Sequence, residues 1–334
     1  FANDRYGVYT FFLSRHQGRL LVSDSAEEIC SRLPGVHLDL RAVVEFIEYG
    51  QLFGDRTHFE EIRKTRPATV LVVSPQGSMS TWRYWSVQRE SIDARRKPPE
   101  VTDLFNRHVA DGLEQAEQPS LPLSGGLDSR TVLSACLPFK EKLHCYTFGI
   151  ASSPDRKLAE RICRELSIPH TFYEMDERIG ETVPENTGKV MSYWNCMVNP
   201  VLLSFQDEFF QRESAVSDLL LVGIGGEVIR CHFFDRVDER VSYDPAVLID
   251  RRTRINGVRN LFAEGFREEE REFAASSLES EISRVETGDP FYTADLFYME
   301  NRVANFSAYG LQLACRYLPN WNPLLFAGII ETRR

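Results

Sequence analysis

The sequence predicts an α/β protein in which a doubly wound parallel sheet follows a β-rich segment and precedes a helical C-terminal part. Between residues 101 and 222, short apolar strands alternate with amphipathic helices, which is typical of a parallel sheet with helices on both faces. Before residue 86 the apolar residues favour a period of two, and after residue 244 they favour the helical period. Two of the predicted buried strands run directly into glycine-rich loops, so we expect a ligand site at one edge of the sheet.

Length and composition place the chain among globular proteins. Its 334 residues correspond to about two domains at roughly 150 residues each, and 43% apolar with 26% charged residues excludes wholesale disorder. The formal net charge of −10 argues against a nucleic-acid partner, and the lack of a run of about 18 apolar residues argues against a membrane partner. The seven cysteines are scattered without a C-x-x-C pair, which indicates reduced thiols, a cytoplasmic location and no zinc site.

The first 85 residues predict strands and one well-delimited helix. The helix spans Asp39 to Tyr49, with Asp39 as its N-cap and Gly50 as the residue that ends it. The segment Ser91–Glu100 is charged and contains two adjacent prolines, so it predicts a linker between a domain of residues 1–90 and a domain of residues 91–334. The expected strands are residues 6–13, 19–22, 69–73 and 80–84.

After the linker, helices and strands alternate. One helix starts at Pro154, with Ser153 as its cap and the proline in its first turn. From Asp244 onward the sequence predicts almost only helix. The expected helices are residues 101–118, 129–136, 154–166 and 201–213, and the expected strands are residues 121–123, 143–148, 170–174 and 219–222.

The segment Leu121–Ser129 carries the most specific motif, Ser-Gly-Gly-Leu-Asp-Ser, where an apolar strand passes into a helix. The two adjacent glycines let the backbone approach a ligand closely, and the two serines add hydroxyl donors. Together with the positive N-terminus of the following helix, these groups form a cradle for phosphate. A carboxylate at Asp128 inside such a cradle predicts a Mg²⁺ ion between it and the phosphates.

This motif resembles the PP-loop of the ATP pyrophosphatase superfamily, and no Walker-type Gly-Lys-[Ser/Thr] follows it. The rest of the chain is similar to the asparagine synthetase family of glutamine-dependent amidotransferases. The resemblance implies an adenine nucleotide alpha hydrolase-like fold that cleaves ATP to AMP and pyrophosphate. The further segments that carry the resemblance are Asn3–Gly7, Gly50–Trp85, Asp295–Arg302 and Asn322–Leu325.

A second glycine-rich loop, Gly223–Glu227, follows the apolar strand 219–222. Because ligands bind beyond the carboxyl ends of the strands in a doubly wound sheet, we expect Glu227 to face Asp128 across one crevice. The resemblance implies that these two carboxylates are catalytic and hold Mg²⁺. It also implies that ATP binds to residues of both loops and to the end of the strand 143–148. These ATP-binding residues are Leu123, Ser124, Gly125, Gly126, Asp128, Ser129, Thr147, Phe148, Gly149, Val222 and Gly223.

Two catalytic parts of the family have no counterpart in this sequence. The family's ammonia-producing half uses an N-terminal cysteine, whereas no cysteine precedes Cys30 here. Residues 1–90 therefore resemble the C-terminal remnant of a class II (Ntn) glutaminase domain in an N-terminally truncated chain. The family's lysine near the C-terminus is also unmatched, since no lysine follows Lys189.

The implied reaction is ATP-dependent amide-bond formation through an acyl-adenylate, similar to glutamine-hydrolysing asparagine synthase in asparagine biosynthesis. A small-molecule or peptidyl carboxylate would be the acyl donor, ammonia from glutamine would be the amine, and a homodimer is one assembly to consider. Two alternatives stay open: an intramolecular amide-forming enzyme of the β-lactam synthetase or lasso-peptide cyclase type, and a degenerate nucleotide-binding scaffold.

Ile224 departs from the family pattern, because asparagine synthetases carry a glutamate directly after the first glycine of the second loop. Isoleucine neither takes a proton nor binds an ammonium group. The sequence therefore predicts that free aspartate is a poor substrate.

Overall fold

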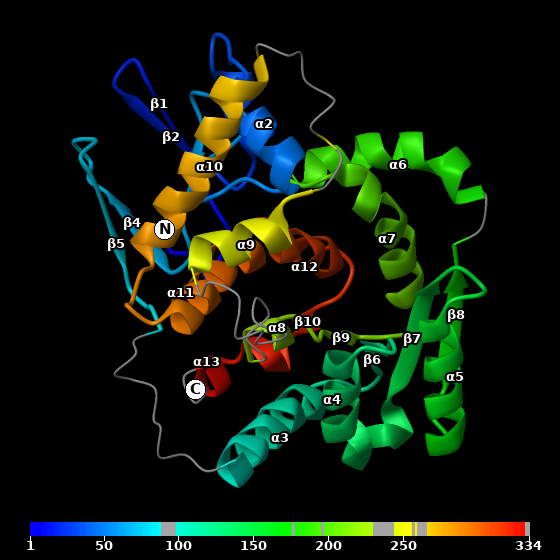
Figure 1. Ribbon diagram of the computed structural model, residues 1–334. Coiled ribbons are helices and arrows are strands. Elements are labelled where there is room, and N and C mark those ends of the chain that lie inside the picture. The colour runs from blue at the N-terminus through cyan, green and yellow to red at the C-terminus, as the bar shows by residue number, and fades with distance from the viewer. Residues whose placement is uncertain are drawn as a thin grey trace. The chain divides into compact units, whose positions relative to one another are not determined.

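The computed structural model describes residues 1–87, 98–175, 178–194, 197–229, 244–255, 258 and 266–330 (Figure 1). Most of the predicted linker, residues 91–97, lies outside these ranges. The chain divides into two compact units. The first comprises residues 1–86, 192–199 and 230–310, and the second comprises residues 87–191, 200–229 and 311–334.

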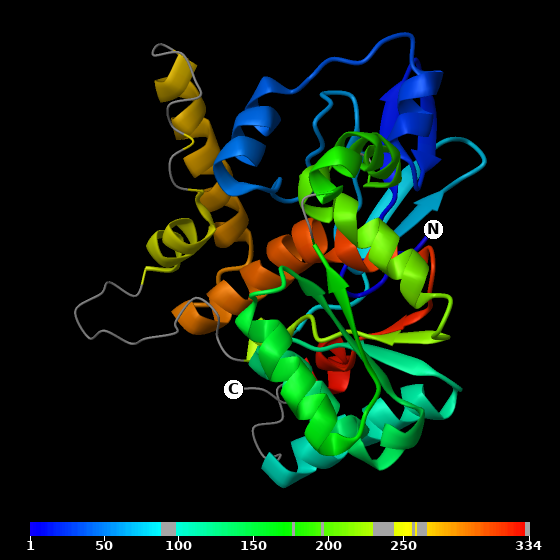
Figure 2. The same ribbon diagram turned by 90° about the vertical axis from the view of Figure 1, so that its right-hand side faces the viewer.

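The second unit is built on a five-stranded parallel sheet with the strand order β10-β9-β6-β7-β8 (Figure 2). The chain passes from β6 to β7 and β8 in one direction, and then returns to add β9 and β10 on the other side of β6. The topological switch point therefore lies between β6 and β9, and the predicted α/β class with a parallel sheet is confirmed. The strands are β6 (Pro119–Pro122), β7 (His144–Gly149), β8 (His170–Glu174), β9 (Leu219–Leu221) and β10 (Asn320–Trp321).

Helices cover both faces of this sheet. Successive side chains along a strand point to opposite sides, so one strand can pack against helices on both faces. Cys145 of β7 packs in one core with α3 (Pro98–Glu114), α4 (Leu127–Cys136) and α5 (Pro154–Leu166). Phe148 of the same strand stacks instead on Phe209 of α7 (Pro200–Glu213), with ring centroids 5.5 Å apart. The remaining helical segments of this part are the 3-10 helix Leu137–Lys142, α6 (Arg178–Trp194), α8 (Gly226–Ile229), the 3-10 helix Pro323–Leu325 and α13 (Ala327–Ile330).

The strand β10 corrects the prediction of almost continuous helix in the C-terminal part. Pro319 and Pro323 flank this strand, and proline inside a helix removes a hydrogen bond and clashes with the preceding turn. The Val222 N–H donates to Trp321 O at 2.9 Å, which pairs β10 with β9. The Trp321 indole N–H donates to His108 O of α3 at 3.0 Å, so contacts distant in sequence hold this segment extended.

The first unit holds a three-stranded antiparallel sheet with the order β2-β1-β3 and a separate β4–β5 hairpin. The strand predicted for residues 6–13 begins only at Phe12. The Asp4 carboxylate accepts the backbone N–H groups of Tyr6, Val8 and Tyr9, and this holds the chain in a compact loop before the strand. The strands are β1 (Phe12–His16), β2 (Arg19–Ser23), β3 (Arg63–Lys64), β4 (Thr69–Val73) and β5 (Met79–Arg83).

Two helix boundaries agree with the sequence prediction. The helix α2 (Leu40–Tyr49) is capped by Asp39, whose Oδ1 accepts two backbone N–H groups of the first turn, and Gly50 ends it with a φ of 68°. Ser153 caps α5 by accepting the Asp155 N–H at 3.2 Å. The helices not yet named are α1 (Ala26–Arg32), α9 (Pro245–Thr253), α10 (Phe266–Arg284), α11 (Pro290–Phe297), the π-helix Tyr298–Ser307 and α12 (Ala308–Cys315).

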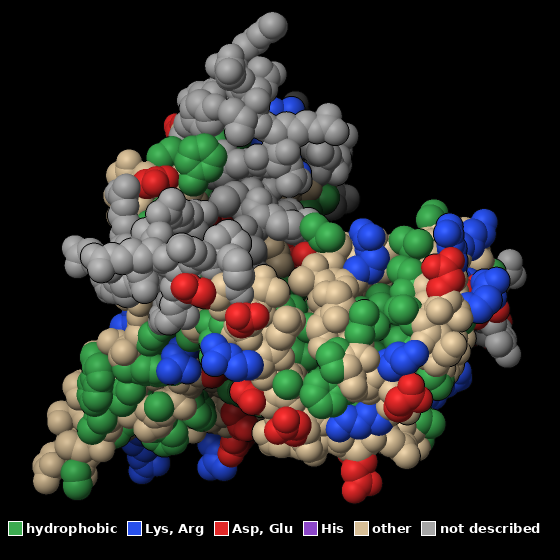
Figure 3. Space-filling view, turned by 90° about the horizontal axis from the view of Figure 1, so that it is seen from below, with side chains coloured by type: hydrophobic (Ala, Val, Ile, Leu, Met, Phe, Trp, Pro, Cys, Tyr) green, Lys and Arg blue, Asp and Glu red, His purple; other side chains and the backbone are tan. Residues whose placement is uncertain are grey.

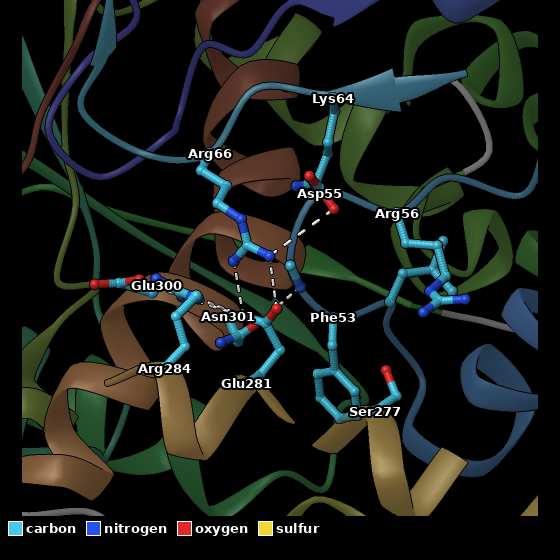
Figure 4. Close-up of polar contacts among 12 residues, drawn as sticks. Phe53, Asp55, Arg56, Lys64, Arg66, Ser277, Glu281, Arg284, Glu300 and Asn301 are labelled. Carbon is cyan, nitrogen blue, oxygen red and sulfur yellow. Dashed lines mark hydrogen bonds and ion pairs between the residues drawn. The ribbon is translucent and has the colours of Figure 1, made fainter. Parts of the chain in front are cut away.

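A polar network joins the N-terminal segment of the first unit to its C-terminal helices (Figure 4). Arg66 donates two hydrogen bonds to the Glu281 carboxylate of α10, at 2.8 and 2.6 Å. Arg284 donates to Glu281 at 3.1 Å and also to Glu300 of the π-helix. Both carboxylates are buried. The network therefore stabilises a contact between residues 215 positions apart in the sequence.

The two compact units do not follow the predicted domain boundary at residue 90. The sequence assigns residues 91–334 to one domain, but residues 230–310 form a compact unit with residues 1–86. The Arg66–Glu281 pair gives the physical reason, since it binds the two segments of this unit directly. The assignment of residues 1–90 to a glutaminase remnant stays a prediction.

Among the described residues, no helix has the length and apolar character needed to cross a membrane. On the face shown in Figure 3, the described Lys and Arg side chains are interspersed with Asp and Glu, and hydrophobic side chains lie between them. The residues drawn in colour there thus present both signs of charge side by side.

We expect Glu281→Gln to lower the free energy of unfolding by about 2–3 kcal/mol, because the partly buried Arg66 guanidinium loses its nearer charged partner and keeps, among the described residues, only Asp55 at 3.9 Å. Urea unfolding followed by circular dichroism measures the change. The control is Glu165→Gln, which removes an exposed partner of Arg161 on α5 and is expected to have no measurable effect. Equal losses in both variants would contradict the structural role of the Arg66–Glu281 pair.

Candidate functional site at the switch point

The glycine-rich motif runs from the end of β6 into α4, at the switch point of the sheet. The Leu123 N–H donates to Tyr146 O at 2.8 Å, which extends the β6–β7 pairing before the chain turns. The helix begins at Leu127 with Gly126 as its N-cap, and no side chain provides a capping bond. The helix starts two residues earlier than predicted, and this places Asp128 in its first turn. A helix N-terminus of this kind is suited to an anion.

Two serine hydroxyls form hydrogen bonds within this loop. Ser129 Oγ accepts the Ser124 N–H at 3.2 Å, and Ser124 Oγ accepts the Gly126 N–H at 3.1 Å. The two hydroxyl oxygens lie 3.1 Å apart. Because a hydroxyl proton rotates to suit its acceptor, each serine can hold the loop and also donate to a ligand oxygen. The two serines therefore hold the loop in this turn.

Asp155 of α5 approaches the same loop with a carboxylate. Its Oδ1 accepts the Gly125 N–H at 2.8 Å, and a Cβ atom on Gly125 would lie 2.6 Å from that oxygen. Glycine is the residue that allows this approach. A carboxylate oxygen bound to this N–H shows that the loop offers a position for an anionic oxygen.

The loop after β9 meets the loop after β6. A Cβ atom on Gly226 would overlap the Asp128 carboxylate, and one on Gly223 would lie 3.4 Å from the Ser129 nitrogen. The Asp128 carboxylate thus lies against the backbone of the residue that precedes Glu227. The structure brings the two predicted loops together, and glycine makes their close approach sterically feasible.

Glu227 has one carboxylate oxygen, Oε2, that is buried and has no hydrogen-bond partner among the described residues. Burying such an oxygen without a partner is costly, so the position fits a cation. With Asp128 beside Gly226, the site offers two carboxylates, which is a number that Mg²⁺ takes from proteins when phosphates supply further oxygens. No group of three or more His, Cys, Asp or Glu side chains suited to a metal occurs in the described part of the chain.

The residues predicted to contact adenine lie at the ends of β6 and β7. Thr147 Oγ1 donates to Leu123 O at 2.6 Å and lies 2.9 Å from His170 Nε2, so the structure brings Leu123 and Thr147 together. Phe148 stacks on α7 and therefore contributes to packing. The Gly149 carbonyl accepts a backbone N–H from the end of β8 at 2.8 Å. Main-chain atoms at these two strand ends border the loop that carries the serines.

Asp155 and Asn322 are not among the site residues predicted from the sequence, although Asn322 begins one of the segments that carry the family resemblance. Asp155 follows Ser153 and Pro154, which signal the start of a helix. A carboxylate in the first turn of a helix is common for that reason alone, so the sequence does not indicate a ligand site at Asp155. Asn322 follows β10, the strand that the sequence does not predict. The order of the strands in the sheet determines where each of these side chains lies, and a local sequence pattern carries no information about that order.

A second buried polar cluster lies between α7, β7 and β8. The Glu213 carboxylate accepts from Tyr173 at 2.8 Å and Ser217 at 3.1 Å, and His144 Nδ1 lies 2.7 Å from it. Burial raises the pKa of this carboxyl, but the hydrogen bonds from His144, Tyr173 and Ser217 outweigh it and hold the pKa below the usual range. Both carboxylate oxygens have partners, so this cluster stabilises the packing of α7 on the sheet.

Residues 100–191 match the family model described as asparagine synthase; this segment includes the loop after β6 but not the loop after β9. A protein of Gibberella zeae named Amidase chry2 is 25% identical over 199 residues, which cover 53% of this chain and 29% of that protein. The chain therefore spans less than a third of the length of this curated relative.

Two solved structures were also found by comparison. The NH3-dependent NAD synthetase from Campylobacter jejuni is 14% identical with a TM-score of 0.31, covering 60% of this chain and 92% of that chain. A predicted subunit of tRNA methyltransferase from Methanocaldococcus jannaschii is 21% identical with a TM-score of 0.22, covering 48% and 74%.

We expect Gly226→Ala to lower the free energy of unfolding by about 1–3 kcal/mol, because the new methyl group overlaps the Asp128 carboxylate. Gly188→Ala on α6 is the control, since a Cβ atom there meets nothing within 4 Å and alanine favours helix. Differential scanning calorimetry compares the Tm values. A Gly226→Ala protein as stable as the wild type would show that the Asp128 carboxylate does not lie against Gly226.

The Glu213 cluster predicts a loss of stability in acid. A carboxyl with a lowered folded pKa stabilises the fold fully above the unfolded value of about 4.3, and this contribution disappears as the pH falls through the folded pKa. Thermal unfolding between about pH 7 and pH 3 should therefore show a smaller acid-dependent drop in Tm for Glu213→Gln than for the wild type. Glu208→Gln, at an exposed position of the same helix, should keep the full drop.

Proposed function

We propose that this chain catalyses ATP-dependent amide-bond formation, with ATP cleaved to AMP and pyrophosphate through an acyl-adenylate. The observation that carries the proposal is the serine-glycine loop at the switch point, within the segment that matches the asparagine synthase family model. The unpaired Glu227 oxygen and the adjacent Asp128 carboxylate supply the charge that a nucleotide-bound cation requires. The name of the Gibberella zeae relative, an amidase, also concerns an amide bond.

In this proposal the chain's own groups bind and position the triphosphate. The Gly125 N–H group and the Ser124 and Ser129 hydroxyls bind the pyrophosphate oxygens, whose negative charge grows as the bond to the α-phosphorus breaks. The Asp155 carboxylate must release the Gly125 N–H for this contact to form. Leu123, Thr147 and Val222 lie at strand ends where main-chain atoms can receive the nucleoside.

Asp128 and Glu227 would hold the metal ion, which, when bound, offsets phosphate charge. The substrate carboxylate then attacks the α-phosphorus and pyrophosphate leaves. An amine next attacks the acyl carbon, loses a proton and displaces AMP, so that the amide forms. The protein's contribution to both steps is positioning and charge stabilisation.

The finer proposal is a glutamine-dependent reaction similar to that of asparagine synthase, with ammonia from glutamine as the amine. The match covers 29% of the curated relative, so we propose the glutamine-dependent reaction for the whole protein and not for this chain alone. Ile224 is half-buried in the loop after β9 and adds no charge there, which favours an acyl donor other than free aspartate.

We expect Asp128→Asn to reduce Mg²⁺-dependent pyrophosphate release by about 100-fold or more, while nucleotide affinity falls much less. The amide keeps the shape of the side chain but removes the charge that holds the metal near the leaving pyrophosphate. Isothermal titration calorimetry with ATP and an ATP–pyrophosphate exchange assay separate the two effects.

Glu141→Gln is the matched control for Asp128→Asn, because the Glu141 side chain is 92% exposed and lies in the 3-10 helix after α4. Its exchange rate should equal that of the wild type. Wild-type exchange in Asp128→Asn would refute the metal-holding role, and ATP binding without any exchange would favour a nucleotide-binding scaffold.

A further inference from the structure

Asn322 is a buried amide that the fold leaves unsatisfied. Both of its polar atoms, Oδ1 and Nδ2, are buried and have no hydrogen-bond partner among the described residues. The 3-10 helix that follows takes no capping bond from this side chain. Asn320, two residues earlier, donates to Leu311 O at 3.2 Å. A buried amide without partners destabilises the folded protein, so its presence points to a ligand that supplies the partners.

Asn322 lies beside the site already described. It directly follows β10, and the Val222 N–H of the neighbouring strand end donates to the carbonyl of the residue before it. A Cβ atom on Gly225 would lie 2.5 Å from Leu325 Cδ2, so the glycine loop packs on the segment that Asn322 begins. The same loop contacts Asp128 at its next residue. Three adjacent strands, β6, β9 and β10, thus place their carboxyl-end residues around one loop.

The chemistry of the amide defines the group that would satisfy it. Nδ2 donates and Oδ1 accepts, so a carboxylate alone satisfies only Nδ2 and an ammonium group alone satisfies only Oδ1. A second amide satisfies both atoms and carries no charge. Ile224 in the adjacent loop offers no ionic partner, so the ammonium and carboxylate groups of a free amino acid would have only the neutral Asn322 amide as a partner. A neutral amide compensates the lost hydration of two charges less well than that of an uncharged amide.

We propose that Asn322 binds an amide group of the acyl donor, which is therefore a carboxylic acid bearing a peptide-type amide rather than free aspartate. The inference rests on the proposed function and names its substrate class. In this role Asn322 contacts the substrate away from the reacting carboxylate, and it has no part in binding ATP.

The test measures ATP–pyrophosphate exchange by the full-length protein with a pool of N-acetylated dipeptides, each with one free carboxylate, and separately with L-aspartate. The wild type should exchange with the pool at least about tenfold above the acid-free background and should stay near background with aspartate. Asn322→Leu, of similar volume, should raise the KM for the active peptide at least about tenfold and leave the KM for ATP unchanged. It should also raise the Tm, because two unpaired polar atoms are removed.

Asn320→Leu is the matched control, because it removes an amide that already has a partner. It should lower the Tm and leave the KM for the peptide unchanged. An unchanged peptide KM in Asn322→Leu, efficient exchange with aspartate, or no exchange with the pool by a protein that binds ATP with Mg²⁺ would each overturn the inference. Failure of the wild type to bind ATP with Mg²⁺ would overturn the proposed function instead.

Discussion

The parallel pairing of β6 with β7 on one side and with β9 on the other is the constraint on which the site depends. Neighbouring strands lie about 4.8 Å apart, so loops that leave adjacent strand ends compete for the same space. Gly226 resolves this competition, since a Cβ atom there would overlap the Asp128 carboxylate in the first turn of α4. The same close approach places the Asp128 carboxylate against Gly226, the residue before Glu227. Strand order thus determines which loops meet, and glycine allows their close approach.

The second unit contains buried polar groups that have hydrogen-bond partners and buried polar groups that have none among the described residues. Glu213 is fully buried, yet hydroxyl and imidazole groups satisfy both of its oxygens, and it contributes to stability. Glu227 Oε2 and the Asn322 amide are buried without partners among the described residues, and both follow strands at the ligand-binding edge of the sheet. Buried polar groups without partners destabilise a fold, so the placement of these two side chains after β9 and β10 supports the proposed ligand site.

The first unit shows a different dependence on long-range contacts. Arg66 and Glu281 lie 215 positions apart, and their paired hydrogen bonds join the N-terminal segment to α10. Composition changes near residue 90 suggest a boundary there, but a compositional boundary does not show which later helices return to the first segment. The buried carboxylates of Glu281 and Glu300 need cationic partners, and Arg66 and Arg284 supply them from separate parts of the chain.

Features set by interactions within a few residues could be predicted from the sequence alone. These include the ends of α2 at Asp39 and Gly50, the cap of α5 at Ser153, the extent of β8 and the position of the serine-glycine motif between a strand and a helix. Only the tertiary structure decided that Trp321 holds β10 extended, that Asp155 contacts the loop after β6, and that Asn322 follows a strand paired with β9. The reason is physical: caps and periodicity depend on neighbours in the chain, whereas these contacts join segments whose proximity exists only after the sheet has formed.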